Sequence, residues 1–416
     1  MKFRLLVLSL CAIFALMTGT SVAAFSESGW NIFKKTYSRP SAIDGFSFEW
    51  QYFMIHDDQN QFTGSIGYVL ADPRGRLGNA QPTNAGDELK KRLFPLSLMP
   101  SGANVAIAGR WSDGSLFADY QRFSSNYIIG QKSWDFMTQR NTQGYIAQLQ
   151  EMQPVSAGEG LFQLTGETDS VTWALSVSPD HLFGKSALEF PTMSGNDVGY
   201  LPTEHWNVHM EWPRTHVEGT ITNKKTQQTY NIEGHGYREN AWGRWNFALD
   251  GWAFSIVSDE THRVQWAWQT YHKSKQMDWL DVSFIDQGTT RVRRFFAKNK
   301  ELKWTLTDWF FDRKARQCVP NAFEIIAQDQ DYRIRASYDL TGKQIPMLST
   351  STPLTNMYVI MIHTPYIKGV IENAKTGEVV TYFEGQGGGE FSTPRSLWKD
   401  LSTTDCEQWG QRFNAL

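Results

Sequence analysis

The chain has 416 residues, which fits two medium-sized domains, each long enough to bury its own core. Its 40 basic and 43 acidic side chains give a formal net charge of −3 at pH 7, and no clustered basic stripe is present, which excludes the phosphate-backbone contacts of a nucleic-acid-binding protein. Aromatic residues make up 14% of the chain, and so much ring surface predicts a ring-lined cavity or groove in addition to ordinary core.

The first 24 residues have the features of a secretory signal. Lys2 and Arg4 precede an apolar run over residues 5–17, and small residues follow at 21–24. This run is shorter than the roughly 20 residues that a membrane-spanning helix needs, and no later stretch is long and apolar enough. We therefore expect residues 1–24 to be removed and the mature protein to be secreted or periplasmic, without a transmembrane segment.

Short segments of alternating polar and apolar residues follow along the chain, and long amphipathic helices are hard to find. Residues 46–52, 171–177 and 264–271 alternate in this way, as half-buried strands do. Gly, Asn, Asp and Pro bound many such segments with turns. Repeated short hairpins favour an all-β barrel or sandwich of antiparallel strands.

One pattern occurs twice in the chain. Residues 49–57 are echoed by residues 251–259, each with a Trp, an aromatic residue two positions later and an Asp seven positions later. Residues 219–239 are echoed by residues 369–390, each beginning with Gly and ending in Glu-Gly-x-Gly-x-x-Glu. The order of these echoes excludes a tandem array of short repeats, whose periods are about 20 to 50 residues.

The echoes instead predict two domain-sized copies. We set the boundary near Ala248, so that residues 25–248 form the first domain and residues 249–416 the second. The first copy is longer because of its loops, and each copy lies in the size range of a barrel of about eight to ten strands.

Cys318 and Cys406 are the cysteines that remain after removal of the signal. In an oxidising compartment they could pair, and the alternative is two buried thiols, because sequence does not supply the geometry that a disulfide needs. We expect the two to be near neighbours, since residues 403–416 must be tied down to be ordered.

Residues 235–245 hold the densest group of chemically able side chains. On a strand, the side chains of Tyr237, Glu239 and Ala241 point to one face, and those of Arg238, Asn240 and Trp242 point to the other. An acid and an aromatic ring can thus enter a cavity together.

At these residues the sequence resembles a known family. The motifs at 49–53, 217–219 and 236–243 resemble the paired-lipocalin family that includes carotenoid 1,2-hydratases (hydroxyneurosporene synthases), bacterial AttH-like proteins and, more distantly, fungal Diels-Alderases and tocopherol cyclases. The family pattern Gly-Tyr-x-Asp-His-x-Trp-Gly keeps its Gly, Tyr and Trp residues here, while Glu239 replaces Asp and Asn240 replaces His.

The resemblance implies an all-β fold of two lipocalin-like antiparallel β-barrels in tandem. It also implies a hydrophobic ligand, such as an isoprenoid, lipid or polyketide-like molecule, and no cofactor. Hydratases of this family are thought to protonate an alkene and to hold the carbocation among aromatic rings, and a carboxylic acid in an apolar pocket can donate such a proton. The implied activity is that of a hydratase, cyclase or isomerase.

The candidate residues follow from this resemblance. The candidate catalytic residues are Glu239, Tyr237, Asn240 and Trp242. The candidate ligand-binding residues are Trp50, Tyr52, Trp252, Trp266 and Trp268. Two departures count against simple transfer of the hydratase chemistry: Asn240 cannot shuttle a proton, and residues 263–272 carry no carboxylate. A protein that only binds its ligand would tolerate both.

Three alternatives remain open at this stage. Glu239 could be one end of a buried ion pair with Arg238 or Arg244. His205, His209 and Glu211 could share a face and hold a metal, although His residues four apart are common by chance and no metal is expected. An exported chain rich in Trp could also bind or cleave carbohydrate, but no convincing pair of acids stands among aromatic residues.

Overall fold

The structure is a computed structural model of the whole chain. It describes residue 30 and residues 47–72, 102–123, 127–129, 133–156, 159–180, 193–196, 205–244, 252–271, 278–313, 316–340, 344–348, 358–363, 366–394 and 400–415. The expected signal at 1–24 and the expected domain boundary at Ala248 lie outside these ranges, so both stay predictions.

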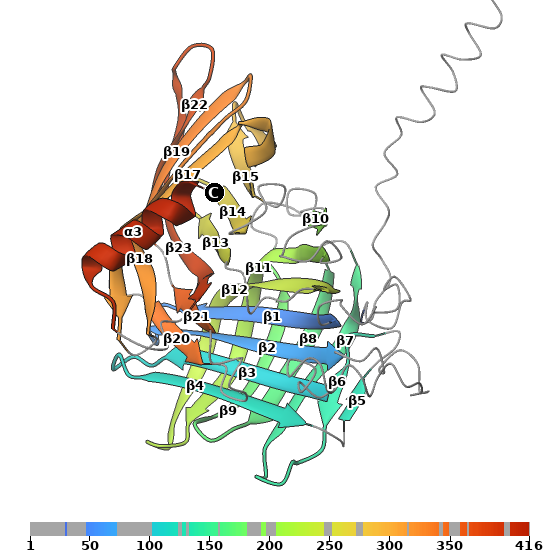
Figure 1. The fold of residues 1–416 in the computed structure, drawn as a ribbon. Coiled ribbons are helices and arrows are strands. Elements are labelled where there is room, and N and C mark those ends of the chain that lie inside the picture. Colours follow the sequence, from blue (N-terminus) through green and yellow to red (C-terminus); the bar gives the residue numbers. More distant parts are fainter. Residues whose placement is uncertain are drawn as a thin grey trace, which may run out of the picture.

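Two large antiparallel sheets make up most of the described chain, which confirms the all-β class (Figure 1). The first sheet contains β1 (Ser47–Asp57), β2 (Phe62–Asp72), β3 (Gly102–Arg110), β4 (Leu116–Phe123), β5 (Tyr127–Ile129), β6 (Phe136–Thr138), β7 (Ile146–Ser156), β8 (Glu159–Glu167), β9 (Val171–Pro179), β10 (Met193–Asn196), β11 (His205–Asn223) and β12 (Gln228–Arg244).

The second sheet contains β13 (Trp252–Asp259), β14 (Val264–Tyr271), β15 (Trp279–Asp286), β16 (Thr289–Phe296), β17 (Leu302–Asp312), β18 (Gln317–Gln328), β19 (Tyr332–Asp339), β20 (Gln344–Leu348), β21 (Tyr358–His363), β22 (Tyr366–Asn373) and β23 (Val379–Pro394). A short 3-10 helix, η6 (Ala297–Asn299), follows β16, and the helix α3 (Thr403–Ala415) ends the described chain.

The two sheets have the same strand order. In the first sheet β4-β3-β2-β1-β12-β11-β9-β8-β7 lie side by side, and in the second β16-β15-β14-β13-β23-β22-β19-β18-β17 do so. The additional strand β10 pairs with β11, and β20 pairs with β21, which lies beside β23. The duplication seen in the sequence is therefore a duplication of topology.

The register of the strands agrees with the sequence echoes. Trp50 lies opposite Ala241 and Trp252 lies opposite Ser392, so the two Trp residues hold corresponding positions in β1 and β13. Gly219 and the later Gly369 likewise lie at corresponding positions of β11 and β22. The expected anchor pairs are thus equivalent in the structure.

Each sheet curves around a core of its own. In the first sheet the Tyr68 hydroxyl donates a hydrogen bond of 2.9 Å to the carbonyl of Gln148, which joins β2 to β7 across the core. In the second sheet the ring of Trp268 on β14 lies 5.0 Å from that of Phe323 on β18. Strands far apart in each sheet therefore face each other, as in a barrel.

The two sheets contact each other through β1, β12, β13 and β23 (Figure 1). The Tyr237 ring on β12 meets the Phe254 ring on β13 edge to face at 5.7 Å. Gly388 on β23 has no side chain, and a Cβ atom there would come within 2.2 Å of the Met54 sulfur on β1. The close approach of Met54 thus requires the glycine.

The C-terminal helix is held by a disulfide. Cys318 on β18 is bonded to Cys406 on α3, with a Cα–Cα separation of 5.2 Å. Gly410 on the same helix faces the indole of Trp309, which leaves no room for a side chain. The expectation that the two cysteines are near neighbours is confirmed.

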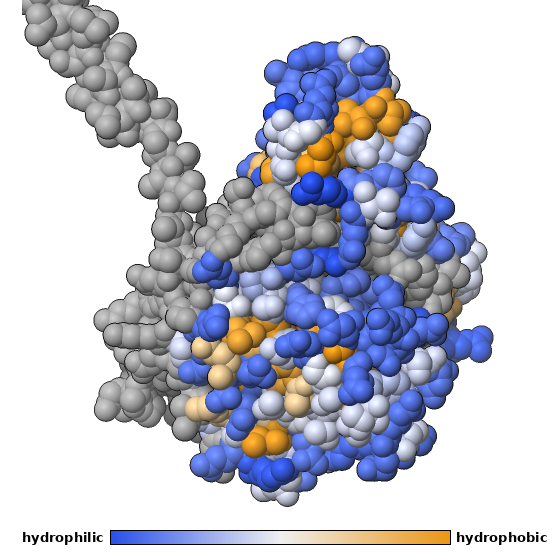
Figure 2. All heavy atoms as spheres, turned by 180° about the vertical axis from the view of Figure 1, so that it is seen from behind, coloured by the Kyte–Doolittle hydropathy of each residue, from blue (hydrophilic) through white to orange (hydrophobic). Residues whose placement is uncertain are grey.

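The surface of the described part is mostly polar (Figure 2). Its exposed large apolar side chains are Met152, Val292, Ile326, Val379 and Tyr382. The Trp side chains whose exposure the structure describes are buried or half-buried. No helix in this part of the chain has the length and apolar character needed to cross a membrane.

Candidate functional site

The candidate site lies where the outward faces of the two sheets meet. Successive side chains of a strand point to opposite faces, and residues paired across strands share a face. On β1 and β12 the pairs Tyr52 with Glu239 and Met54 with Tyr237 point out of the first sheet, toward the second. On β13 and β23 the pair Phe254 with Glu390 shares one face in the same way.

Glu239 is a carboxylic acid enclosed by protein. Its side chain is 5% exposed, and its Oε1 accepts a hydrogen bond of 2.9 Å from the indole Nε1 of Trp50. Burial, opposed by the bond from Trp50 and aided by the nearby charge of Glu390, raises the pKa of Glu239 to about 8. Burial outweighs the indole bond, so the acid is mostly protonated at neutral pH.

Glu390 repeats this arrangement in the second sheet. Its Oε2 accepts a hydrogen bond of 3.2 Å from the indole Nε1 of Trp252. Burial raises the pKa of Glu390 to about 7, and both Tyr52 and Trp252 oppose this rise. Each half therefore contributes one Trp-bonded acid, and the two acids lie close enough for the charge of one to act on the other.

Two tyrosines lie beside these acids. The rings of Tyr52 and Tyr237 are 5.8 Å apart, and both side chains are buried. The Tyr237 hydroxyl makes no hydrogen bond to a described residue, although a buried polar group normally has a partner. The Tyr52 hydroxyl lies near the Glu390 carboxylate and affects its pKa. Burial raises the pKa of both phenols, and the charges of Glu390 and Glu239 add to this, so both hydroxyls keep their protons.

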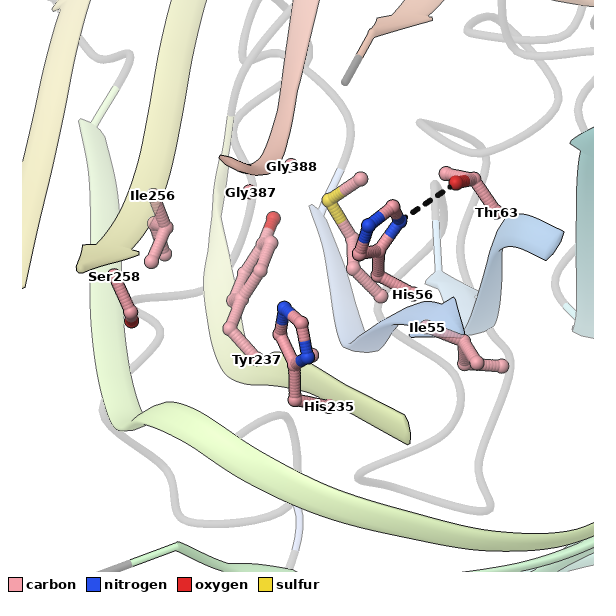
Figure 3. Close-up of a pocket in the computed structure, with 11 residues that line it drawn as sticks. Ile55, His56, Thr63, His235, Tyr237, Ile256, Ser258, Gly387 and Gly388 are labelled. Atoms are coloured by element: carbon pink, nitrogen blue, oxygen red, sulfur yellow. Dashed lines mark hydrogen bonds between the residues drawn. The ribbon is translucent and has the colours of Figure 1, made fainter. Parts of the chain in front are cut away.

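A pocket opens at the end of this row of side chains. It has about 340 Å³ of space, including solvent at its mouth, and both sheets line it. Figure 3 shows Tyr237 and His235 side by side on β12, with His56 facing them and the Tyr237 hydroxyl pointing toward Gly388 of the second sheet. The cavity that we expected at the junction is thus bordered by Tyr237, but histidines and not tryptophans line it.

Two histidines mark the mouth of the pocket. His56 is bonded to the Thr63 hydroxyl through Nδ1 at 2.8 Å and to Asp58 through Nε2 at 2.9 Å. The His235 ring lies 5.2 Å from that of His56. Burial lowers the pKa of His235 to about 4, with smaller contributions from the positive charges of Arg214 and His56, so this imidazole is neutral at pH 7.

The inward face of the same strands carries a separate polar group. Arg238 is fully buried, donates a hydrogen bond of 2.6 Å to the Gln51 side chain, and lies over the rings of Phe162 and Trp212 at 4.5 and 5.0 Å. Since Arg238 and Glu239 point to opposite faces, the alternative of an ion pair between them is wrong. The side chain of Arg244 lies outside the described part.

The four candidate catalytic residues are therefore divided between two faces. Glu239 and Tyr237 reach the junction of the sheets. Asn240 and Trp242 point inward, where the Asn240 amide donates a hydrogen bond of 2.9 Å to the buried carboxylate of Glu49. The structure thus brings two of the four together.

The candidate ligand-binding residues are divided in the same way. Trp50, Tyr52 and Trp252 lie beside the two acids. Trp266 and Trp268 instead point into the core of the second sheet, where they pack near Tyr338. They help to form that core and do not reach Glu239.

Glu390 is not among the candidate residues predicted from the sequence, since it follows a Gly-rich stretch. In the structure its rings come from other strands, namely Trp252 on β13 and Tyr52 of the other sheet. The echo of Glu-Gly-x-Gly-x-x-Glu was the one indication that could have identified it.

One group of side chains in the described ranges has metal-ligand character. His216, Glu218 and Glu233 bring their ligand atoms within 4.8 Å of one another on the first sheet. His216 lies 3.5 Å from Glu233 and 3.8 Å from Glu218, which a protonated histidine would hold as ion pairs without a metal. The side chains of His205, His209 and Glu211 lie outside the description.

Comparison with known proteins gives structural similarity only. No protein-family model matches the chain, and no curated protein matches it in sequence. In structure it is similar to an AttH-like protein from Nitrosomonas europaea, with a TM-score of 0.46 and 11% identity over 86% of this chain and 96% of the other. An AttH-like protein is thus among the similar structures, as the sequence motifs predicted.

Two further structures are similar to the same degree. Kievitone hydratase from Nectria haematococca has a TM-score of 0.45 and 10% identity over 88% of this chain and 95% of its own. CghA, solved with Sch210972, has a TM-score of 0.46 and 9% identity over 89% of this chain and 98% of its own. At this distance the likeness transfers no residue role, ligand or activity.

Proposed function

We propose that the protein binds a hydrophobic small molecule between its two sheets and acts on it by acid catalysis, as a hydratase, cyclase or isomerase. The observation that carries this proposal is the neutral, buried Glu239 beside Trp50 at the junction. A protonated carboxyl with a pKa near the working pH is a suitable proton donor. The ligand class is an isoprenoid, lipid or polyketide-like molecule.

The second acid supports catalysis as well as binding. The pKa of both acids is raised, and the charge of Glu390 raises the pKa of Glu239, so loss of a proton from Glu390 favours the protonated form of Glu239. Two carboxyls whose environments separate their pKa values can act as acid and base in one site. A protein that only stores a ligand has no need of such a pair, whose burial costs stability.

A carbohydrate-binding function is the second candidate, and the surface does not favour it. Sugar sites stack rings on exposed aromatic side chains, and the Trp side chains whose exposure the structure describes are buried or half-buried. The rings beside Glu239 and Glu390 are enclosed between the sheets. This arrangement suits an apolar molecule better than a hydrated sugar.

We also propose that the protein acts in an oxidising compartment outside the cytoplasm. The disulfide between Cys318 and Cys406 supports this, because such bonds persist in secreted and periplasmic proteins. Sequencing the N-terminus of the exported protein tests it. The expected new N-terminus lies near Phe25, and a mature chain that retains Met1 would contradict the proposal.

The ligand and its turnover can be tested together. An organic extract of the purified protein is analysed by mass spectrometry, and the extracted molecule is returned to the protein in D₂O. Acid catalysis at Glu239 predicts deuterium in the product, loss of this label in Glu239→Gln, and unchanged binding, because the amide keeps the shape but donates no acidic proton.

Glu233→Gln is the matched control, since Glu233 lies on the same strand but is exposed. It should keep full turnover. If Glu239→Gln instead retains turnover and loses thermal stability, Glu239 is structural and the catalytic proposal falls.

A further inference from the structure

We infer that the site takes a ligand bearing a carbonyl oxygen, which the Tyr237 hydroxyl and the acid of Glu239 hold by hydrogen bonds. This inference rests on the proposed function, because it names the chemical class of the same ligand. It goes beyond that function because it states which side chains bind the carbonyl oxygen of an otherwise apolar ligand.

The first step is that the Tyr237 hydroxyl has no partner among the described residues. Tyr237 is 1% exposed, and its hydroxyl is not hydrogen-bonded. A buried polar group left in this state costs stability. An acceptor supplied by a ligand would remove that cost, and a purely hydrocarbon ligand would not.

The second step is that the available groups are donors. Both phenols keep their protons, and the acid of Glu239 does so at neutral pH. Since Oε1 of Glu239 accepts the bond from Trp50, Oε2 is the oxygen left to carry the proton. Proton donors from phenols and a neutral acid complement an oxygen with two lone pairs, as a carbonyl group provides.

The third step is that the donors lie together. Tyr52 is directly opposite Glu239 in the register of β1 and β12, and Tyr237 is two residues before Glu239 on the same face. The two phenol rings are 5.8 Å apart. Phenol and protonated carboxyl donors that act together on a carbonyl oxygen stabilise the negative charge that develops on it, as the active site of ketosteroid isomerase does.

The fourth step is the comparison with the second sheet, which lacks these donors. The position of Tyr52 is taken there by Phe254, and the position of Tyr237 is taken by Gly388. The scaffold thus accepts Phe at the first position and no side chain at the second. The tyrosines are not required by the fold, and their retention in the first sheet fits a role toward a ligand.

The test uses β-ionone, an isoprenoid ketone, and the hydrocarbon of the same skeleton in which methylene replaces the carbonyl group. Binding of each is measured to wild-type protein and to the variant Tyr237→Phe. We expect the ketone to bind roughly tenfold more tightly than the hydrocarbon, and the variant to lose most of this preference while hydrocarbon binding stays within about twofold.

Infrared spectroscopy of the wild-type complex gives a second readout that needs no variant. The carbonyl stretch of bound β-ionone should shift to lower frequency than in an apolar solvent, and the shift should shrink in Tyr237→Phe. Tyr382→Phe is the control, because Tyr382 is 63% exposed and does not line the pocket. It should bind both probes as the wild type does.

The results of these experiments distinguish the inference of a carbonyl ligand from the proposed function. Equal binding of ketone and hydrocarbon to the wild type, with no shift of the carbonyl band, would overturn the inference and leave the proposed apolar site intact. If the wild type binds neither probe, the proposed function itself is contradicted, and the inference falls with it.

Discussion

The two sheets share one topology and differ where they meet. The first sheet presents Tyr52, Tyr237 and His235 to the junction, and the second presents Phe254 and Gly388 at the positions that correspond to the tyrosines. What both sheets keep is the Trp-bonded glutamate. The duplication therefore supplied a symmetric pair of acids, and divergence of one copy added hydrogen-bond donors around them.

Another pair of hydrogen bonds occurs in both halves and serves the fold. The Asp57 carboxylate accepts a hydrogen bond of 3.1 Å from the backbone N–H of Glu233, and the Asp259 carboxylate accepts one of 2.8 Å from that of Glu384. These bonds link β1 to β12 and β13 to β23 at the same place. These bonds give Asp57 and Asp259, which occupy the same position of the repeated pattern, a structural role.

The largest expected difference between the halves concerns the disulfide. In the described chain it ties α3 to the second sheet. Cys318→Ser should destabilise that half by about 3 kcal/mol, because the unfolded chain loses a constraint. Hydrogen exchange measured by mass spectrometry should report loss of protection in β17, β18 and α3, with the first sheet unaffected.

Cys406→Ser is the matched variant and should behave in the same way. Equal loss of protection in both sheets would show that the halves do not unfold separately. It would contradict the view that they are two independent copies.

A pair of glycines tests the equivalence of the two sheets directly. A Cβ atom on Gly236 would lie 1.7 Å from the carbonyl oxygen of Met54, and one on Gly387 would lie 1.9 Å from that of Ile256. Since backbone cannot give way easily, Gly236→Ala and Gly387→Ala should each cost about 3 kcal/mol. Chemical denaturation measures both.

Gly377→Ala serves as a contrast, because no atom lies within 4 Å of its Cβ position, although its φ of 75° adds some strain. A large cost at Gly236 together with none at Gly387 would contradict the equivalence of the two strand pairs.

The pH dependence of stability tests the pair of acids. The folded-state pKa values of Glu239 and Glu390, about 8 and about 7, lie above the ordinary value of 4.5. The folded protein therefore holds protons that the unfolded chain releases. Its free energy of unfolding should fall as the pH rises above about 4.5, by about 1.4 kcal/mol per pH unit for each acid, until about pH 7 for Glu390 and about pH 8 for Glu239.

Urea denaturation across this range measures the slope. Glu239→Gln should remove the contribution of one acid, whereas the exposed control Glu233→Gln should leave the slope unchanged. His235 acts in the opposite sense, because its pKa is lowered to about 4 and the stability it contributes is lost as the pH falls below about 6.5. An unchanged slope in Glu239→Gln would contradict a neutral acid at this position.

Several features could be predicted from the sequence because they depend on local pattern. Alternation indicated the strands, and the echoes placed Trp50 and Trp252 at equivalent positions. Alternation also separated Glu239 from Arg238. These inferences need only the period of a strand and the comparison of one half with the other.

The partners of the acids could not be predicted in this way. Alternation divides a strand into two faces but does not say which one points into the barrel, so Trp266 and Trp268 were assigned to the ligand and lie in the core. One neighbour of Glu390, Tyr52, comes from the other sheet, and the alternation within a strand does not predict contacts between the two halves.

The most direct test of the account is the protonation state of Glu239 in the folded protein. Infrared difference spectroscopy across pH 4 to 10 resolves the band of a protonated carboxyl, and comparison with Glu239→Gln and Glu390→Gln assigns it. The account predicts a band assigned to Glu239 that persists at pH 7 and disappears with a midpoint near 8. A midpoint near the ordinary 4.5 would mean that Glu239 is charged at neutral pH, and it would contradict the proposed acid.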